Sequence, residues 1–255
     1  MDEQDLMPFF MEIHSGNSRE GPGSRASTTR AFQLLTELPP RPHILDVGCG
    51  PGMQTMDLAR LTGGDITAVD NHPPYLEALR THIDAQGLAT RVRAVQGDMT
   101  ALEYGPERFD LIWSEGAIYI IGFEQGLRQW RKLLKPGGYL AVTELSWLTE
   151  DPPEAVRSFW AKGYPAMQTV DANLAAIEAC GYRLNGHFTL PASDWWANYY
   201  NPIAAKLPTF RKKHHAHPAA QTAVDMELAE MALFRKYADA YGYVFYTLRR
   251  AVPGP

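Results

Sequence analysis

The sequence has little cysteine and no long apolar run. Cys49 and Cys180 are its only cysteines in 255 residues, so we expect no disulfide framework and a reducing compartment. No stretch reaches the roughly 18 consecutive apolar residues needed to span a bilayer. The first residues, MDEQDLMPFF, lack a basic leader followed by an apolar segment. These absences predict a soluble, cytoplasmic protein without a membrane span.

Positive charge is also scarce. The chain has 24 Lys+Arg against 29 Asp+Glu, a formal net charge of -5. Duplex binding depends on clustered positive charge that displaces the counterions of the phosphates, so we expect no nucleic-acid partner. The His/Lys block at 211–217 has no cysteine nearby, and adjacent histidines on a helix point apart. A metal site is therefore not expected there.

What the sequence does have is a regular alternation of apolar strands and helices. Alternation on this scale is typical of βαβ units and of a parallel sheet covered on both faces, an α/β doubly wound fold. The predicted strands are 43–47, 66–69, 92–95, 109–113 and 139–145, with helices at 52–62, 73–86 and 123–134. The last of these helices is expected to end where Pro and Gly turn the chain, at 135–138.

The flanking regions are predominantly helical. A short helix at 5–14 precedes a Gly/Ser/Pro-rich loop at 15–24, and a second helix is expected from Ala26 to the prolines at 39–40. After residue 151 the predicted elements are helices at 153–163 and 170–180, a strand at 182–190, a helical block at 193–240 and a last strand at 243–249.

The most informative segment is HILDVGCGPG, residues 43–52. A strand carries Asp46 at its end, and Gly48, Gly50 and Gly52 form a tight turn into a helix. Glycine is favoured where the backbone passes close to a ligand or takes unusual angles. A dinucleotide site uses G-x-G-x-x-G to receive a pyrophosphate. Here the spacing is G-x-G-x-G after an acid, which would repel pyrophosphate and favours a cationic ligand over a nicotinamide cofactor.

Acidic residues also end the next two predicted strands. Asp70 follows the second strand, 24 positions after Asp46, and Asp98 with Met99 follows the third. A carboxylate at Asp70 could accept both hydroxyls of a ribose. Asp70 or Asn71 could equally be the N-cap of the helix that begins near Pro73, and both roles are compatible. Ligands of open α/β sheets bind at this carboxyl edge.

In combination, these motifs resemble the class I S-adenosylmethionine (SAM)-dependent methyltransferase family. The segments that carry the resemblance lie within 40–146 and read DVGCGPG, Asp70, GDM, FDLIWSEG and LLKPGGYL. More narrowly, segments 18–24, 113–127 and 237–246 resemble a group of bacterial small-molecule methyltransferases. The resemblance implies a Rossmann-like seven-stranded sheet of order 3-2-1-4-5-7-6 in which strand 7 is antiparallel, with a helical insertion between strands 6 and 7.

The resemblance also implies the positions that bind SAM. By motif matching, Asp46, Gly48 and Gly50 would hold the methionyl part, Asp70 the ribose, and Asp98 and Met99 the adenine. Ser114 and Glu115 would lie beside the methionyl group and the acceptor, and Asn71 is a further expected cofactor contact. The product would be S-adenosylhomocysteine.

Methyl transfer is an in-line displacement, so the enzyme mainly holds the nucleophile, methyl and sulfur in line. A base matters only where the acceptor loses a proton. The candidates for a catalytic role at this edge are Glu115, Tyr119 and His14, with Glu115 favoured as a polar orienting group. The loop bearing Arg19 is either an ordinary surface loop or a lid, and the resemblance favours a lid.

Acceptor specificity is expected from the insertion. Its aromatic residues, together with others near the same edge, would suit an apolar or aromatic small molecule, although aromatic residues are most often core. The predicted acceptor contacts are Trp113, Trp147, Trp195 and Tyr199.

We therefore expect one methyltransferase domain over 1–255. Its parts would be N-terminal helices and lid loop at 1–40, a SAM-binding core at 41–150 and an acceptor-side insertion at 191–241. The function expected is SAM-dependent methylation of a small molecule. The alternatives are a non-catalytic SAM-binding or regulatory protein and an RNA or protein methyltransferase. A homodimer is compatible with the sequence.

Overall fold

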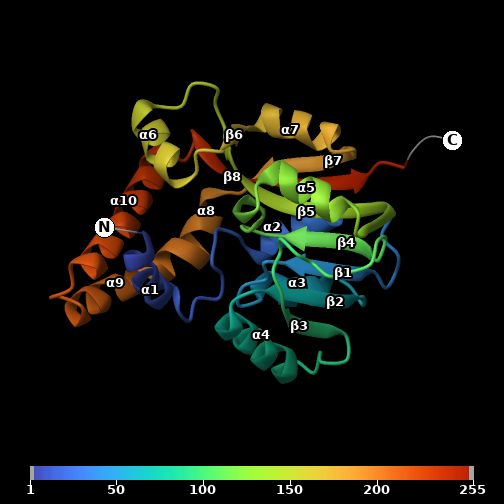
Figure 1. Ribbon diagram of the computed structural model, residues 1–255, viewed down its shortest axis with the longest axis horizontal. Coiled ribbons are helices and arrows are strands. Elements are labelled where there is room, and N and C mark those ends of the chain that lie inside the picture. The colour runs from blue at the N-terminus through green and yellow to red at the C-terminus, as the bar shows by residue number, and fades with distance from the viewer. Residues whose placement is uncertain (1–2, 253–255) are drawn as a thin grey trace.

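A mostly parallel sheet forms the centre of the structure, a computed structural model that describes residues 3–252 (Figure 1). Its strand order is β3-β2-β1-β4-β5-β8-β7, and β6 pairs with β5 off this path. The strands are β1 (His43–Val47), β2 (Asp65–Asp70), β3 (Val92–Gln96), β4 (Phe109–Ser114), β5 (Leu134–Trp147), β6 (Gln168–Thr169), β7 (Tyr182–Thr189) and β8 (Tyr241–Arg250). Only β8 runs antiparallel to its neighbours, β5 and β7. The expected order is confirmed, and the two-residue strand β6 is an addition to it.

Helices cover both faces of the sheet. The helices of the described chain are α1 (Glu3–His14), α2 (Arg25–Gln33), α3 (Met53–Leu61), α4 (Pro73–Ala85), the 3-10 turn η1 (Ile118–Ile120), α5 (Phe123–Arg131), α6 (Glu154–Gly163), α7 (Val170–Ala179), α8 (Ala192–Trp195), the π-helical η2 (Trp196–Tyr200), α9 (Asn201–Lys213) and α10 (Pro218–Tyr237). Buried residues of α2, α3 and α4 pack on one face of the sheet. Those of α5 and α7 pack on the other.

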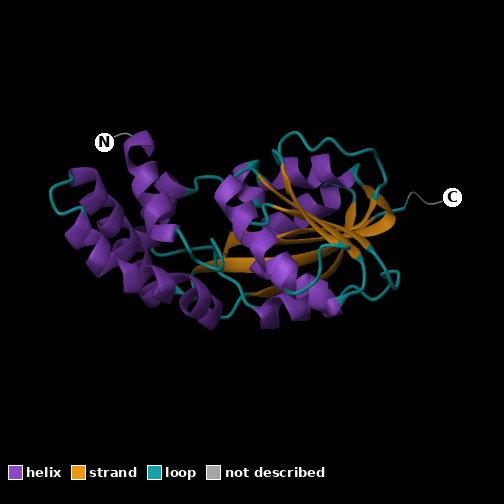
Figure 2. Cartoon of the chain, turned by 90° about the horizontal axis from the view of Figure 1, so that it is seen from below, coloured by secondary structure: helices purple, strands orange, loops and turns teal. Residues whose placement is uncertain are grey.

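A third apolar cluster joins α1, α9 and α10 beside one end of the sheet. Figures 1 and 2 show these helices gathered at that end, away from the helices that cover the faces. The cluster includes the stacked rings of Trp195 and Phe234, whose centroids are 4.1 Å apart. The predicted helical block between β7 and β8 is thus a small bundle that also includes the N-terminal helix.

Most boundaries shift by a few residues, and two differ more from the predictions. Helix α2 ends at Gln33 rather than at the prolines, with Leu34 as its C-cap, and Asn185 Nδ2 of β7 donates to the Leu34 carbonyl. Segment 135–138 does not separate α5 from β5 but lies within β5. It bulges there, since Leu134 pairs with Phe109 while Tyr139 pairs with Leu111. The Lys135 ammonium, 2.8 Å from Asp110 Oδ2, ties the bulge to β4.

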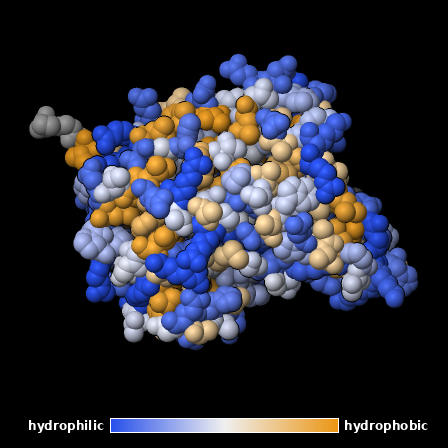
Figure 3. Space-filling view, turned by 180° about the vertical axis from the view of Figure 1, so that it is seen from behind, coloured by the Kyte–Doolittle hydropathy of each residue, from blue (hydrophilic) through white to orange (hydrophobic). Residues whose placement is uncertain are grey.

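The surface and the cysteines add little that is unusual. On the face shown in Figure 3, hydrophobic and hydrophilic residues are interspersed, as expected for a folded chain whose accessible surface is more than half apolar. Both cysteines are free and buried. Within residues 3–252 no helix is long and apolar enough to cross a membrane. The expected domain of 1–255 includes residues 1, 2 and 253–255, which lie outside the described residues.

Candidate active site

The loop from β1 into α3 bends tightly over the carboxyl edge of the sheet. Gly48, Gly50 and Gly52 all have positive φ, between 53° and 92°, a region that residues with a Cβ rarely adopt. The Gly48 N–H donates to the Val69 carbonyl over 2.9 Å. A Cβ on Gly48 would lie 2.4 Å from the Cβ of Ala117. Glycine is therefore required at position 48 both by its angle and by space.

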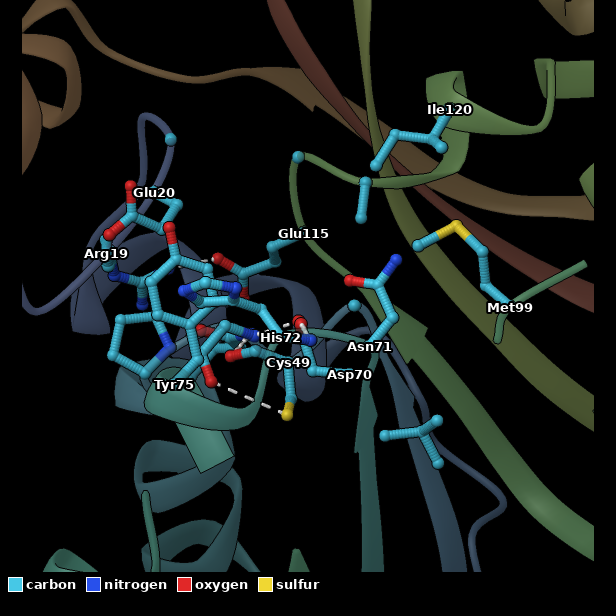
Figure 4. A pocket seen from close by; sticks show the side chains of 18 of the residues that line it. Arg19, Glu20, Cys49, Asp70, Asn71, His72, Tyr75, Met99, Glu115 and Ile120 are labelled. Atoms are coloured by element: carbon cyan, nitrogen blue, oxygen red, sulfur yellow. Dashed lines mark hydrogen bonds and ion pairs between the residues drawn. The ribbon is translucent and has the colours of Figure 1, made fainter. Parts of the chain in front are cut away.

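A cavity of about 510 Å³ opens beside this loop. Its lining includes the ends of β1, β2 and β3, the segment after β4, and residues Arg19–Pro22 from the loop between α1 and α2. In Figure 4, Glu20 and Tyr75 lie on one side of it and Met99 and Ile120 on the other. The volume is within the ~300–1,000 Å³ typical of small-ligand pockets.

Asp70 lines this cavity and also holds the loop. Its Oδ2 accepts from the Gly50 N–H and its Oδ1 from the His72 N–H, each over 2.9 Å. The N-cap of α4 is His72, so neither Asp70 nor Asn71 fills that position as expected. A carboxylate has about four acceptor sites, so the Asp70 carboxylate keeps capacity for hydroxyl donors after these two bonds.

Three other predicted cofactor residues line the same cavity. Asn71, Asp98 and Met99 lie at the ends of β2 and β3. Asp98 is exposed, and its Oδ1 accepts from the backbone N–H and the hydroxyl of Thr100, each over 2.8 Å. These hydrogen bonds hold the pKa of Asp98 below its usual value.

Asp46 and Ser114 do not line the cavity. Asp46 is 0% exposed; its Oδ2 accepts from the Thr55 hydroxyl over 2.5 Å, and its Oδ1 has no hydrogen-bond partner among the described residues. Burial raises the pKa of Asp46 to about 7, against the opposing effect of the Thr55 bond. Ser114 is also fully buried, and its Oγ has no partner within the described chain. Both side chains are buried away from the cavity that the other predicted cofactor residues line.

Glu115 is held by three donors. Its Oε2 accepts from Arg19 over 2.5 Å, and its Oε1 accepts from the Thr28 hydroxyl and the Trp113 indole N–H over 2.8 and 2.9 Å. The side chains of Arg19 and Glu115 are both 3% exposed. The Arg19 guanidinium also lies 3.7 Å from Asp57 Oδ2. Glu115 therefore anchors the loop of Arg19 at the cavity wall, an orienting geometry.

The loop at 15–24 is tied to the helical bundle as well. Lys206 Nζ of α9 donates to the Ser15 carbonyl and to Asn17 Oδ1 over 2.7 and 2.6 Å. Asn198 donates to the Gly23 carbonyl over 2.9 Å. In this geometry the loop covers the cavity edge, with Gly21 and Pro22 in the lining.

His14 lies at the start of this loop but outside the cavity. Its two ring nitrogens are each 2.9 Å from a carboxylate, of Glu20 and of Glu227. Burial lowers the pKa of His14, but the two hydrogen bonds outweigh it and raise the pKa to about 9. Because both nitrogens are engaged, His14 fits a structural link between loop and bundle better than the catalytic role expected of it.

A second cavity of about 190 Å³ adjoins the first. We call it the aromatic chamber; its rings are Tyr119, Trp160, Tyr164, Trp195, Tyr199 and Tyr243. The two cavities share Glu20, Gly21, Pro22, Gly116 and Tyr119 as lining residues. Tyr119, 42% exposed, stands between them. Among the predicted acceptor contacts, Trp195 and Tyr199 line the chamber.

Trp113 and Trp147 line neither cavity. The Trp113 ring is 0% exposed and packs edge-on against Phe245 with centroids 5.2 Å apart. Trp147 packs on the bundle cluster. Alternation along a strand explains Trp113: its side chain points to the α2–α4 face of the sheet. The expectation that it contacts the acceptor does not fit this placement.

Sequence reasoning missed the acidic side chains around the chamber. Glu230 of α10 lines it, and Glu144 of β5 accepts from the hydroxyl of Tyr164, a lining residue. Both acids interrupt apolar segments, YLAVTELSW for Glu144 and AVDMELAEMALF for Glu230. That interruption was a usable signal, since an acid on a buried face calls for a partner. No cluster of three or more His, Cys, Asp and Glu within residues 3–252 is placed to hold a metal.

Comparisons with known proteins agree with this geometry. Residues 44–138 match the family model of a methyltransferase domain. The chain is 26% identical over 207 residues to a sterol 24-C-methyltransferase of Yarrowia lipolytica, covering 76% of this chain and 54% of the relative. The chain thus spans about half the length of that curated relative.

Among solved structures, a SAM-dependent methyltransferase of Geobacter sulfurreducens in complex with S-adenosylhomocysteine superimposes with a TM-score of 0.80 at 20% identity, covering 94% of this chain and 97% of that one. The cyclase SpnF has a TM-score of 0.73 at 21% identity, with 97% and 93% covered. At these identities the likeness establishes the fold. Residues 44–138 carry the matched methyltransferase domain, and the fold around it is the Rossmann-like methyltransferase fold of these structures.

Proposed function

We propose that the chain transfers the methyl group of SAM to a small-molecule acceptor bound in the aromatic chamber. The observation that carries the proposal is the junction of the two cavities. The larger one runs along the carboxyl edge of the sheet, and it meets the chamber at Gly116 and Tyr119 under the loop at 21–22. A donor in one cavity and an acceptor in the other would meet at that junction.

The residues of the larger cavity fit SAM. Ala117 and Met99 pack against Gly48 where a Cβ would lie, which holds the tight glycine turn beside the cavity. The Asp70 carboxylate has acceptor sites for the two ribose hydroxyls, and the apolar side chain of Met99 could pack against the adenine ring. SAM supplies an activated methyl group; the protein's own part is to hold the two reactants in line and exclude water.

The acceptor side is the rest of the proposal. Aromatic walls favour an apolar or planar acceptor. Glu115, with both oxygens engaged, would orient groups around the methyl rather than accept a proton. Tyr119 is the hydroxyl at the junction and the better-placed polar contact for the acceptor.

Two measurements test the proposal. Calorimetry with SAM, S-adenosylhomocysteine and NAD should give binding for the first two alone. Methyl-labelled SAM incubated with fractionated small metabolites should then yield a labelled small molecule. Binding without any transfer would favour a non-catalytic SAM-binding protein. Label in RNA or protein at physiological salt, with none in small molecules, would overturn the proposed acceptor class.

A further inference from the structure

The walls of the aromatic chamber are acidic, with no basic side chain among them. Its lining includes Glu20 and Glu230 but no Lys, Arg or His. Glu20 already binds His14 through Oε2. Glu230 accepts from the Tyr200 hydroxyl over 2.8 Å through Oε1. Glu230 is half-buried and is one of the lining residues of the chamber.

A second acid lies directly behind this wall. Glu144 is 2% exposed, and its Oε1 accepts from the hydroxyl of Tyr164. Its Oε2 is buried and has no hydrogen-bond partner among the described residues. An unpaired buried carboxylate oxygen is costly. Glu144 and Glu230 therefore place two acidic groups at the chamber without a Lys, Arg or His among its lining residues to pair with them.

The hydrogen-bond partners of these two acids are uncharged tyrosine hydroxyls, of Tyr164 and Tyr200. Burial raises the pKa of Glu144 to about 8, against the opposing Tyr164 bond. Burial also raises the pKa of Glu230 to about 7; the Tyr200 bond and the more distant His14 lower it, while Glu227 raises it. His14 is itself bonded on both nitrogens, to Glu20 and Glu227. A cation inside the chamber would favour the ionised form of both acids.

The rings of the chamber add to the attraction. Tyr119 and Tyr164 meet edge to face with centroids 5.7 Å apart, and Trp195 and Tyr243 meet at 5.4 Å. The faces of Trp and Tyr rings attract ammonium groups through their negative quadrupole, most strongly where water is excluded. Aromatic faces and nearby carboxylates together are a combination that recognises an organic cation.

We propose that the aromatic chamber recognises an acceptor that carries an ammonium group, with Glu230 facing that group and the rings enclosing it. That the bound molecule is the methyl acceptor rests on the proposed function, whereas the chamber's preference for cations does not depend on it. The volume of about 190 Å³ is below the ~300–1,000 Å³ of pockets for drug-sized ligands. The chamber therefore holds a small amine, or the ammonium end of a larger molecule that extends toward the junction.

The test compares two ligands of the same shape. Choline carries a quaternary ammonium, and 3,3-dimethylbutan-1-ol is its uncharged carbon analogue. Calorimetry on the chain saturated with S-adenosylhomocysteine should show choline binding at least about tenfold more tightly than the alcohol. Glu230→Gln keeps the shape of the side chain and should reduce that preference to about twofold or less. Asp225→Asn on the same helix, an exposed carboxylate bonded to Arg211, should leave it unchanged.

Equal affinity for both ligands, tighter binding of the alcohol, or no binding of either would overturn the inference. A folded Glu230→Gln protein that keeps the unmodified chain's preference for choline over the alcohol would also overturn the inference. If that variant does not fold, the comparison of the two ligands on the unmodified chain decides. S-adenosylhomocysteine is titrated first. If it fails to bind, the proposed function fails, while the choline comparison on the ligand-free chain still tests the chamber.

Discussion

The two cavities are built in different ways. The larger cavity takes Gly48, Asp70 and Asp98 from the ends of three successive strands, and its shape is set by backbone angles. The aromatic chamber collects Glu20, Tyr119, Tyr164, Trp195, Glu230 and Tyr243 from segments far apart in the chain, and its shape is set by side-chain packing. We infer that cofactor binding is sensitive to backbone changes and acceptor binding to changes of side-chain charge.

The largest effect is expected from Gly48→Val in the first region. The added side chain would overlap Ala117, and φ of +69° strains any residue with a Cβ. Binding of S-adenosylhomocysteine by calorimetry should fall below detection while far-UV circular dichroism keeps the native spectrum. Gly87→Val is the control, since Gly87 has φ of +65° but nothing within 4 Å of its added Cβ. If Gly48→Val binds S-adenosylhomocysteine normally, the larger cavity does not depend on the backbone angles of this loop.

Arg19 anchors the loop at the wall of the larger cavity, so its removal should affect the fold itself. Arg19→Met would leave the buried carboxylates of Glu115 and Asp57 without this partner. Breaking one side of a buried pair costs about 3–5 kcal/mol, to be measured as the free energy of unfolding in urea. Arg157→Met removes an exposed ion pair and should cost about 1 kcal/mol or less. A similar small cost at Arg19 would mean that the loop is not anchored there.

His14 ties the loop to the bundle in a pH-dependent way. Its folded pKa of about 9 exceeds the unfolded value of about 6.5. The charged form therefore adds stability that is complete below about pH 6.5 and is lost as the pH rises through about 9. The difference in unfolding free energy between the native chain and His14→Gln should shrink across that window, by on the order of 3 kcal/mol at most. A constant difference from pH 6 to 9.5 would contradict the charge on His14.

The smallest of these effects is expected at Asp70. Asp70→Ala should weaken binding of S-adenosylhomocysteine by about 1.5–3 kcal/mol, the range for hydrogen bonds to a charged group. It also releases the N–H groups of Gly50 and His72, so part of the loss would come from the loop. Asp84→Ala, at an exposed position of α4, is the control. Calorimetry that shows equal affinity for both variants would remove Asp70 from the binding site.

The difference between the two cavities also explains which parts of the candidate site could be predicted from the sequence. The parallel sheet followed from the alternation of apolar strands and helices, and its strand order from the family resemblance; β1 begins and ends at the predicted residues. Gly48, Asp70, Asp98 and Met99 were found because each follows a strand directly, and parallel strands bring their carboxyl ends to one edge. That region could be predicted because its geometry is local.

The rest depended on contacts that no local pattern encodes. Asp46 follows the same rule as Asp70, yet its side chain turns inward to Thr55. Trp113 looked like an acceptor contact but points to the α2–α4 face. Glu144 and Glu230 come together around the chamber only because α10 packs beside the carboxyl end of β5. The direction of a side chain, and the partner it meets across the fold, are properties of packing.

We propose that the larger cavity holds the cofactor with its sulfur toward the aromatic chamber. A crystal structure of the chain with S-adenosylhomocysteine tests it most directly. We expect the ribose hydroxyls at Asp70, the adenine beside Met99 and the sulfur next to Gly116 and Tyr119. Density for the nucleoside elsewhere, or a sulfur that points away from the chamber, would contradict it.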